Sequence, residues 1–133
     1  MFFKDNSLVN RVGGLFMKRI LIADDAQFMR LAIRKMLEKH DCEIVDEAAN
    51  GLEAVEKYIK YTPDIVTMDI TMPEMDGVQA IREIKKINPD AKILVISAMG
   101  QEIHVKEAVM AGASGFIVKP LKEEDIVKSI MRL

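Results

Sequence analysis

The chain has 133 residues, of which 50% are hydrophobic and 30% charged, and this composition is sufficient for one compact domain with a single core. Its net charge of −2 argues against nucleic acid as the main partner, because nucleic-acid binding requires a basic surface. The single cysteine, Cys42, excludes a disulfide within the chain. No apolar stretch approaches the ~20 residues of a membrane span and no leader peptide is recognisable, so we expect a cytoplasmic protein without membrane insertion.

The first sixteen residues differ from the rest of the chain. Residues 1–16 mix apolar and polar side chains without a clear period, and they include the pair Gly13-Gly14. Three interpretations stay open: a loosely docked tail, a segment upstream of a natural start at Met17, or, least favoured, a functional extension. We assign residues 17–133 to one domain.

From residue 17, short apolar runs alternate with amphipathic stretches of helix length. In chain order, the expected strands cover residues 19–23, 43–47, 64–69, 92–97 and 115–118. The expected helices cover residues 26–39, 51–60, 78–87, 101–111 and 123–133. This alternation is typical of a doubly wound α/β domain, in which a five-stranded parallel sheet carries helices on both faces.

Apolar spacing also predicts which helix residues pack against the sheet. The expected inward residues are Phe28, Leu31, Ala32, Met36 and Leu37 in the first helix, Leu52, Val55 and Ile59 in the second, Val78, Ile81 and Ile84 in the third, and Ile126, Ile130 and Leu133 in the last. In the first helix, the expected outward residues are mainly Arg30, Arg34 and Lys35. Asn50 is expected to cap the second helix and Gly112 to end the fourth. The strand at 43–47 is the less apolar one and is therefore expected near an edge of the sheet.

Four of the five apolar runs end in side chains suited to phosphate chemistry. Asp24 and Asp25 follow the first run, Asp69 ends the third, Ser97 ends the fourth and Lys119 follows the fifth. The carboxyl ends of parallel strands lie along one edge of a sheet, where ligands bind. We therefore expect these five side chains to converge on one site, although each alone has an ordinary explanation as a turn or a helix cap.

The residue types at this expected site indicate a metal and a phosphoryl group. Crowded carboxylates repel one another unless a cation joins them, and oxygen ligands without clustered Cys or His favour Mg²⁺. Asp24 and Asp25 stand together as an ion-holding pair, whereas Asp69 stands alone and suits the role of a nucleophile that forms an aspartyl phosphate. Lys119 would neutralise phosphoryl oxygens, and Ser97 would donate a hydrogen bond to one of them.

Longer motifs surround these residues. They are Ile-Ala-Asp-Asp-Ala-Gln-Phe-Met-Arg (22–30), Thr-Met-Asp-Ile-Thr-Met-Pro-Glu-Met-Asp-Gly (67–77), Ile-Ser-Ala-Met-Gly (96–100) and Gly-Ala-Ser-Gly-Phe-Ile-Val-Lys-Pro (112–120). They resemble the receiver domain of bacterial two-component response regulators, and most closely the single-domain chemotaxis regulators of the CheY group. The resemblance covers residues 17–133 and implies a flavodoxin-like fold.

The resemblance also implies a role for each acidic residue. Asp69 would be the phosphoacceptor, and the phosphoryl donor would be a phosphohistidine on a sensor histidine kinase. Asp25, Asp69 and the backbone carbonyl of Thr71 would bind Mg²⁺ directly, while Asp24 would act mainly through metal-bound water. A receiver catalyses its own phosphorylation and slow dephosphorylation, but it is a switch and not an enzyme that turns over a substrate.

The remaining implied roles concern the switch. Ser97 and Lys119 would contact the phosphoryl group, and Ser97 together with Phe116 would change the surface of the protein. The Lys119-Pro120 peptide bond would be cis. Phe116 departs from the best-known enteric pattern, in which a Tyr is often found, so a hydroxyl contact to a target is missing.

Thr71 and Met99 occupy the positions that tune the attack of water on the phosphoryl group. The Met99 thioether is a weak acceptor, so we expect slow hydrolysis and a separate phosphatase. A flagellar switch protein is the expected output partner, and we expect a monomer. The alternatives are a phosphorelay intermediate or a Mg²⁺-dependent phosphohydrolase. Such hydrolases typically place a second Asp two residues after the nucleophile, where this chain has Thr71.

Overall fold

The structure is a computed structural model that describes residues 11–12 and 15–133. Arg11–Val12 (β1) and Leu15–Phe16 (β2) pair in an antiparallel two-stranded sheet, which the sequence pattern does not predict. The other residues of the segment 1–16 lie outside the described residues, so the three interpretations of this segment stay open. Among the described residues, no helix has the length and apolar character needed to cross a bilayer.

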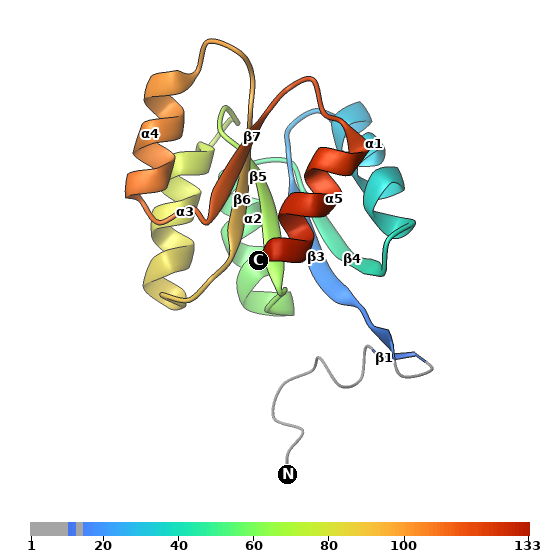
Figure 1. Cartoon of the computed structure of the whole chain (residues 1–133). Coiled ribbons are helices and arrows are strands. Elements are labelled where there is room, and N and C mark those ends of the chain that lie inside the picture. Colours follow the sequence, from blue (N-terminus) through green and yellow to red (C-terminus); the bar gives the residue numbers. More distant parts are fainter. Residues whose placement is uncertain (1–10, 13–14) are drawn as a thin grey trace.

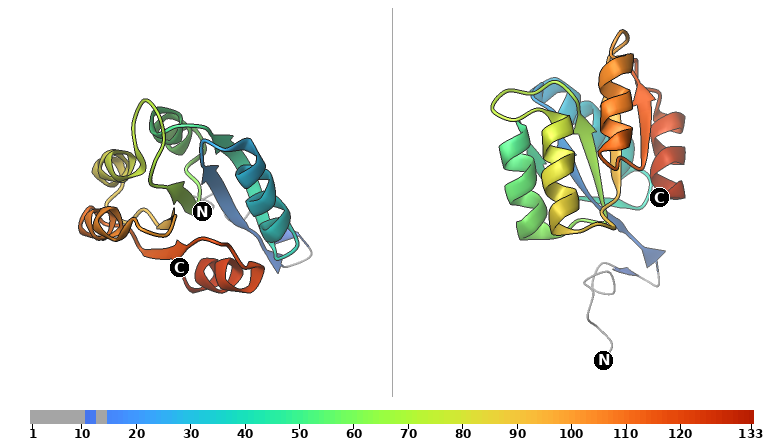
Figure 2. Two further views of the ribbon diagram at one scale, coloured as in Figure 1. Left: turned by 90° about the horizontal axis from the view of Figure 1, so that it is seen from above. Right: turned by 90° about the vertical axis from the view of Figure 1, so that its left-hand side faces the viewer.

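Five parallel strands form the main sheet in the order β4-β3-β5-β6-β7. The strands are β3 (Lys18–Ala23), β4 (Cys42–Ala48), β5 (Ile65–Asp69), β6 (Ile93–Ser97) and β7 (Gly115–Val118). The helices that follow them are α1 (Gln27–Glu38), α2 (Gly51–Tyr61), α3 (Gly77–Ile87), α4 (Glu102–Met110) and α5 (Glu123–Arg132). Helices α1 and α5 cover one face, and α2, α3 and α4 cover the other (Figures 1 and 2). The prediction of a doubly wound, flavodoxin-like fold is confirmed.

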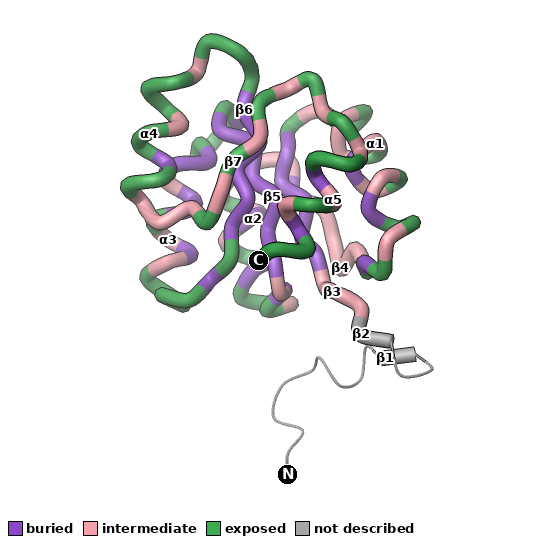
Figure 3. The backbone as a smooth tube through the Cα atoms, in the orientation of Figure 1, coloured by how far each residue is buried: buried purple, intermediate pink, exposed green. Residues whose placement is uncertain are grey.

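The core consists of two apolar layers, one on each face of this sheet. Strands β5 and β6 are buried along their whole length, as the central purple segments in Figure 3 show. Strand β4 lies at one edge, as its lower apolar content predicts, and β7 lies at the other. Burial of this apolar surface is the main force that stabilises the fold and fixes the strand ends in space.

The predicted inward face of α1 is partly wrong. Phe28 and Leu31 are exposed, at 72% and 49%. The guanidinium groups of Arg30 and Arg34, which were expected to point mostly outward, donate to the two carboxylate oxygens of Glu47 on β4 at 2.9 and 2.8 Å. These ion pairs fix the rotation of α1, and its buried residues are Ile33 and Leu37.

The predicted inward face of α2 is also partly wrong, because Leu52 and Ile59 are 46% and 57% exposed. The Gly51 amide donates to the carbonyl oxygen of Met75 at 2.8 Å, and a Cβ at Gly51 would lie 2.2 Å from that oxygen. Because of this close backbone contact, the face of α2 that contains Gly51 and Ala54 packs against the core. The buried residues of α2 are Gly51, Ala54 and Tyr58.

The predicted caps of α2 and α4 are confirmed, and so are the inward faces of α3 and α5 except for Leu133, which lies just after α5 and is half-buried. The Asn50 side chain accepts a hydrogen bond from the Glu53 amide at 2.8 Å and caps α2. Gly112 adopts a left-handed conformation, with φ of 113°, just after α4. In α3 and α5 the buried residues include Val78, Ile81, Ile84, Ile126 and Ile130.

Candidate functional site

The predicted site residues lie at the carboxyl ends of four adjacent strands. Asp24 follows β3, Asp69 ends β5, Ser97 ends β6 and Lys119 follows β7. Because these strands are parallel and neighbouring, their ends lie along the same edge of the sheet (Figure 1). The structure therefore brings together side chains that are separated by up to 95 residues in the sequence.

Three carboxylates and one ammonium group form a tight cluster at this edge. One oxygen from each of Asp24, Asp25 and Asp69 lies within 4.8 Å of the other two. The Lys119 Nζ lies 3.7 Å from Asp24 Oδ2 and 3.8 Å from Asp69 Oδ1. Asp24 and Asp69 are buried, Asp25 is exposed, and the Lys119-Pro120 peptide bond is cis as expected.

Backbone amides orient the two buried carboxylates. Asp24 Oδ1 accepts a hydrogen bond from the Ala26 amide at 2.9 Å, and Asp69 Oδ1 accepts one from the Ile70 amide at 3.0 Å. Asp24 Oδ2 is buried and has no hydrogen-bond partner among the described residues. The Lys119 ammonium, 3.7 Å away, is beyond hydrogen-bond distance, so a bound cation or another donor would stabilise this buried oxygen further. The oxygen-only donor set fits a hard divalent ion such as Mg²⁺, which Asp24, Asp25 and Asp69 would hold.

The environment of Asp69 favours its protonated form. Burial, and then the negative charge of Asp24, raise the pKa of Asp69 to about 6, although the nearby Lys119 ammonium opposes the shift. At neutral pH the carboxyl is therefore mainly ionised but close to its titration range. It combines a high pKa for an aspartate with a position beside a cation, which suits a reactive oxygen nucleophile.

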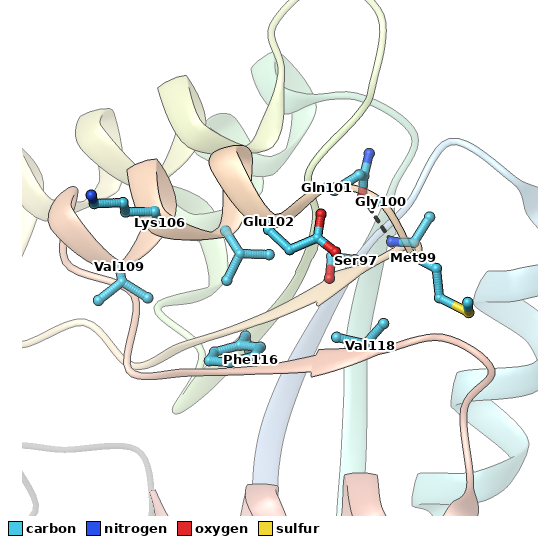
Figure 4. Close-up of a pocket in the computed structure, with 11 residues that line it drawn as sticks. Ser97, Met99, Gly100, Gln101, Glu102, Lys106, Val109, Phe116 and Val118 are labelled. Carbon is cyan, nitrogen blue, oxygen red and sulfur yellow. Dashed lines mark hydrogen bonds between the residues drawn. The ribbon is translucent and has the colours of Figure 1, made fainter.

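Ser97 connects this cluster with a hollow on the protein surface. Its hydroxyl is fully buried and has no hydrogen-bond partner among the described residues. The hollow, of about 460 Å³, lies between the loop after β6, α4 and β7, and Ser97 forms part of its wall (Figure 4). Its apolar lining includes Met99, Val105, Val109, Phe116 and Val118.

The loops after β5 and β6 contain the two residues expected to tune hydrolysis. Thr71 and Met99 are both exposed, Met99 at 77%. The structure adds Gln101, whose Nε2 donates to Thr71 Oγ1 at 2.8 Å and whose Oε1 accepts from the Ala98 amide at 2.7 Å. Gln101 is not predictable from the sequence, because a single amide residue before a helix carries no distinctive pattern.

Comparisons with known proteins agree with this geometry. Residues 20–131 match the response regulator receiver domain. The chain is 55% identical to the chemotaxis protein CheY of Thermotoga maritima over 87% of this chain and 97% of that protein. It is 54% identical to CheY of Bacillus subtilis over 84% of this chain and 93% of that protein.

Solved structures lead to the same assignment. The structure is similar to the crystal structure of the CheX-CheY-BeF3-Mg complex from Borrelia burgdorferi, with a TM-score of 0.83, 38% identity and 90% of each chain covered. The response regulator domain of Thermotoga maritima CheB matches with a TM-score of 0.76 and 34% identity, over 87% of this chain and 92% of that one. The chain therefore belongs to the response regulator receiver domain family, and within it is closely related to the chemotaxis CheY proteins.

Proposed function

We propose that this protein is a phosphorylation-activated switch in chemotaxis or motility control. A sensor histidine kinase transfers a phosphoryl group to Asp69, with Mg²⁺ held by Asp24, Asp25, Asp69 and the Thr71 carbonyl. The phosphorylated protein signals by a change in its binding to other proteins. The observation that carries this proposal is the cluster of three carboxylates and Lys119 at the ends of adjacent strands.

Each residue of the cluster has a distinct task in this scheme. The Asp69 carboxylate attacks phosphorus and forms the new P–O bond, while the P–N bond to the donor histidine breaks and its electron pair goes to the imidazole nitrogen. The Lys119 ammonium, already 3.8 Å from Asp69 Oδ1, neutralises charge on the phosphoryl oxygens. Mg²⁺ contributes further charge neutralisation when bound. The Ser97 hydroxyl, which lacks a partner, is available to donate to a phosphoryl oxygen.

The output surface is the apolar hollow beside Ser97. Movement of the Ser97 hydroxyl toward Asp69 leaves space on the side of the hollow, into which the half-exposed Phe116 can rotate. The surface around Val105, Val109 and Phe116 then changes shape. This arrangement links a charge at the strand ends to an apolar surface, which is the kind of surface that binds proteins.

Labelling with acetyl phosphate tests the phosphoacceptor. With Mg²⁺, the purified protein should incorporate about one phosphoryl group, and mass spectrometry should place it on Asp69. The Asp69→Asn variant should incorporate none. Labelling at another residue would contradict the assignment. Multiple-turnover release of phosphate from small phosphate esters would instead favour the phosphohydrolase.

A binding experiment tests the output. The protein, with or without beryllofluoride and Mg²⁺, is used to capture partners from cells. The chemotaxis relatives support a partner in motility control, for which we propose a flagellar switch protein, and the Borrelia complex supports a CheX-type protein. Recovery of a flagellar protein only in the presence of beryllofluoride and Mg²⁺ is the expected result. Transfer of the phosphoryl group onward to a histidine protein would identify a phosphorelay intermediate.

A further inference from the structure

The side chain of Gln101 bridges two loops on either side of the phosphorylation site. Its Oε1 accepts from the Ala98 amide at 2.7 Å, which is the dashed contact in Figure 4, and its Nε2 donates to Thr71 Oγ1 at 2.8 Å. Ala98 directly follows Ser97, and Thr71 lies two residues after Asp69. One amide group therefore ties the loop after β6 to the loop after β5.

This bridge is notable because Gln101 stands at the N-cap position of α4. A side chain at this position often accepts a hydrogen bond from the first turn of its helix, but Gln101 makes no such bond. The other residues of the loop after β6 pack loosely. Gly100 has a φ of 88° with no heavy atom within 4 Å of the place where its Cβ would lie, and Met99 is 77% exposed.

We propose that Gln101 is a positioning residue that stabilises the unphosphorylated arrangement of the loop after β6, an inference that rests on the proposed function. When the Ser97 hydroxyl moves toward a phosphoryl group on Asp69, the Ser97-Ala98 peptide moves with it. The hydrogen bond from the Ala98 amide to Gln101 opposes this movement. Phosphorylation must therefore release the Gln101 bridge, which frees the Ala98 amide and the Thr71 hydroxyl for other partners.

The bridge has a measurable consequence for the affinity of a phosphoryl analogue. Loss of the bridge should stabilise the activated arrangement relative to the unphosphorylated one. We expect Gln101→Ala to bind beryllofluoride, at saturating Mg²⁺, roughly threefold to tenfold more tightly than the parent, as the loss of one or two hydrogen bonds from one state implies. Binding is measured by titration, followed through the backbone amide resonances of Ser97 and Ala98.

Three further variants distinguish the hydrogen bonds from other effects. Gln101→Met fills the same space without a hydrogen bond and should bind as tightly as Gln101→Ala. Gln101→Glu can still accept from the Ala98 amide and from the Thr71 hydroxyl, so it should not show the tighter binding of Gln101→Ala. Gln79→Ala is the matched control, because Gln79 is also half-buried and its Nε2 donates to Glu83 at 3.0 Å, on α3.

The resonance of the Ala98 amide proton reports the bridge directly. Without ligand, it should shift upfield in Gln101→Ala and Gln101→Met, and stay unchanged in Gln79→Ala. Unchanged or weaker beryllofluoride binding by Gln101→Ala, in a parent that binds the analogue and is labelled on Asp69, would overturn the proposed role of Gln101. A parent that neither binds the analogue nor is labelled would overturn the proposed function itself.

Discussion

The carboxyl group of Asp69 should make the metal-free protein sensitive to pH. Burial and the charge of Asp24 raise its pKa from 3.8 to about 6, so the folded state binds this proton more tightly than the unfolded state. The free energy of unfolding therefore decreases as the pH rises between these two values, by up to about 3 kcal/mol for this group. Below pH 3.8 this decrease in the free energy of unfolding is absent, and above pH 6 it has reached its full size.

Urea denaturation in EDTA, at intervals from pH 4 to pH 7, checks this expectation. Other carboxyls titrate in the same range, so the quantity to compare is the difference in free energy between the parent and Asp69→Asn. That difference should grow in favour of Asp69→Asn as the pH rises. A difference independent of pH would contradict the raised pKa of Asp69.

Met99 and Thr71 should determine the lifetime of the phosphorylated state. Hydrolysis requires a water molecule held in line with the leaving carboxylate, and neither the exposed Met99 thioether nor the Thr71 hydroxyl, which accepts from Gln101, is arranged to hold it. We expect Met99→Glu to speed hydrolysis roughly tenfold, and more when combined with Thr71→Asn. Loss of phosphate from the purified protein in Mg²⁺ gives the rate. Met110→Glu, at a residue 79% exposed on α4, should leave it unchanged.

At the scale of elements, a glycine allows α3 to pack closely against the loop that follows β5. The Gly77 amide donates to the Ile70 carbonyl at 2.7 Å, and a Cβ at Gly77 would lie 2.1 Å from the carbonyl oxygen of Asp69. Gly77→Ala should therefore force backbone atoms apart and cost roughly 1–3 kcal/mol of stability. Gly115→Ala is the control, because its nearest contact would be an ordinary 3.6 Å. Equal stability of the two variants, by denaturation, would contradict this packing argument.

Coupling between β6 and the hollow should depend on the Ser97 hydroxyl. Ser97 both lines the hollow and ends β6, which lies beside β5. A change in the ratio of active to inactive conformations from 1:99 to 99:1 requires about 5.5 kcal/mol of differential stabilisation. We expect Ser97→Ala to bind beryllofluoride still, but with smaller shifts of the methyl resonances of Val105, Val109 and Val118. Shifts as large as in the parent would show that the surface responds through another route.

The elements were predictable where one periodicity dominates. The apolar runs at β5 and β6 are buried on both faces, so their composition identifies them without any tertiary information. The inward faces of α1 and α2 were partly mispredicted because tertiary contacts decided them. The ion pairs of Glu47 orient α1, and the backbone contact between Gly51 and Met75 orients α2.

The site likewise contains residues that were predictable from the sequence and one residue that depends on tertiary contacts. Its charged residues were predictable because each directly follows or ends a recognisable strand, and the parallel topology places all strand ends together. Gln101 was not predictable, because its importance comes from two loops that meet only in the folded chain. The spacing of residues in the sequence does not predict that contact.

For the whole molecule, crowding of three carboxylates opposes folding, and we expect a bound metal ion to remove that penalty. Asp24 and Asp25 follow β3 and Asp69 ends β5, so the repulsion between Asp69 and this pair opposes the folded state and is relieved in the unfolded chain. A cation that binds only the folded state stabilises it by mass action, by about 2.7 kcal/mol at a hundredfold excess over its dissociation constant. We therefore expect Mg²⁺ to raise the melting temperature of the parent.

Asp25→Ala isolates this contribution because Asp25 is exposed and its removal leaves the core intact. In this variant the gain from Mg²⁺ should be lost over the same concentration range, while the metal-free protein should melt at or above the temperature of the parent, since one repelling charge is gone. Thermal melts in EDTA and in rising Mg²⁺ measure both effects. Asp90→Ala, at an exposed position between α3 and β6, is the control and should keep the full response to Mg²⁺. A parent whose melting temperature does not change at saturating Mg²⁺ would refute the metal assignment, because crowded carboxylates that bind a cation cannot avoid this linkage.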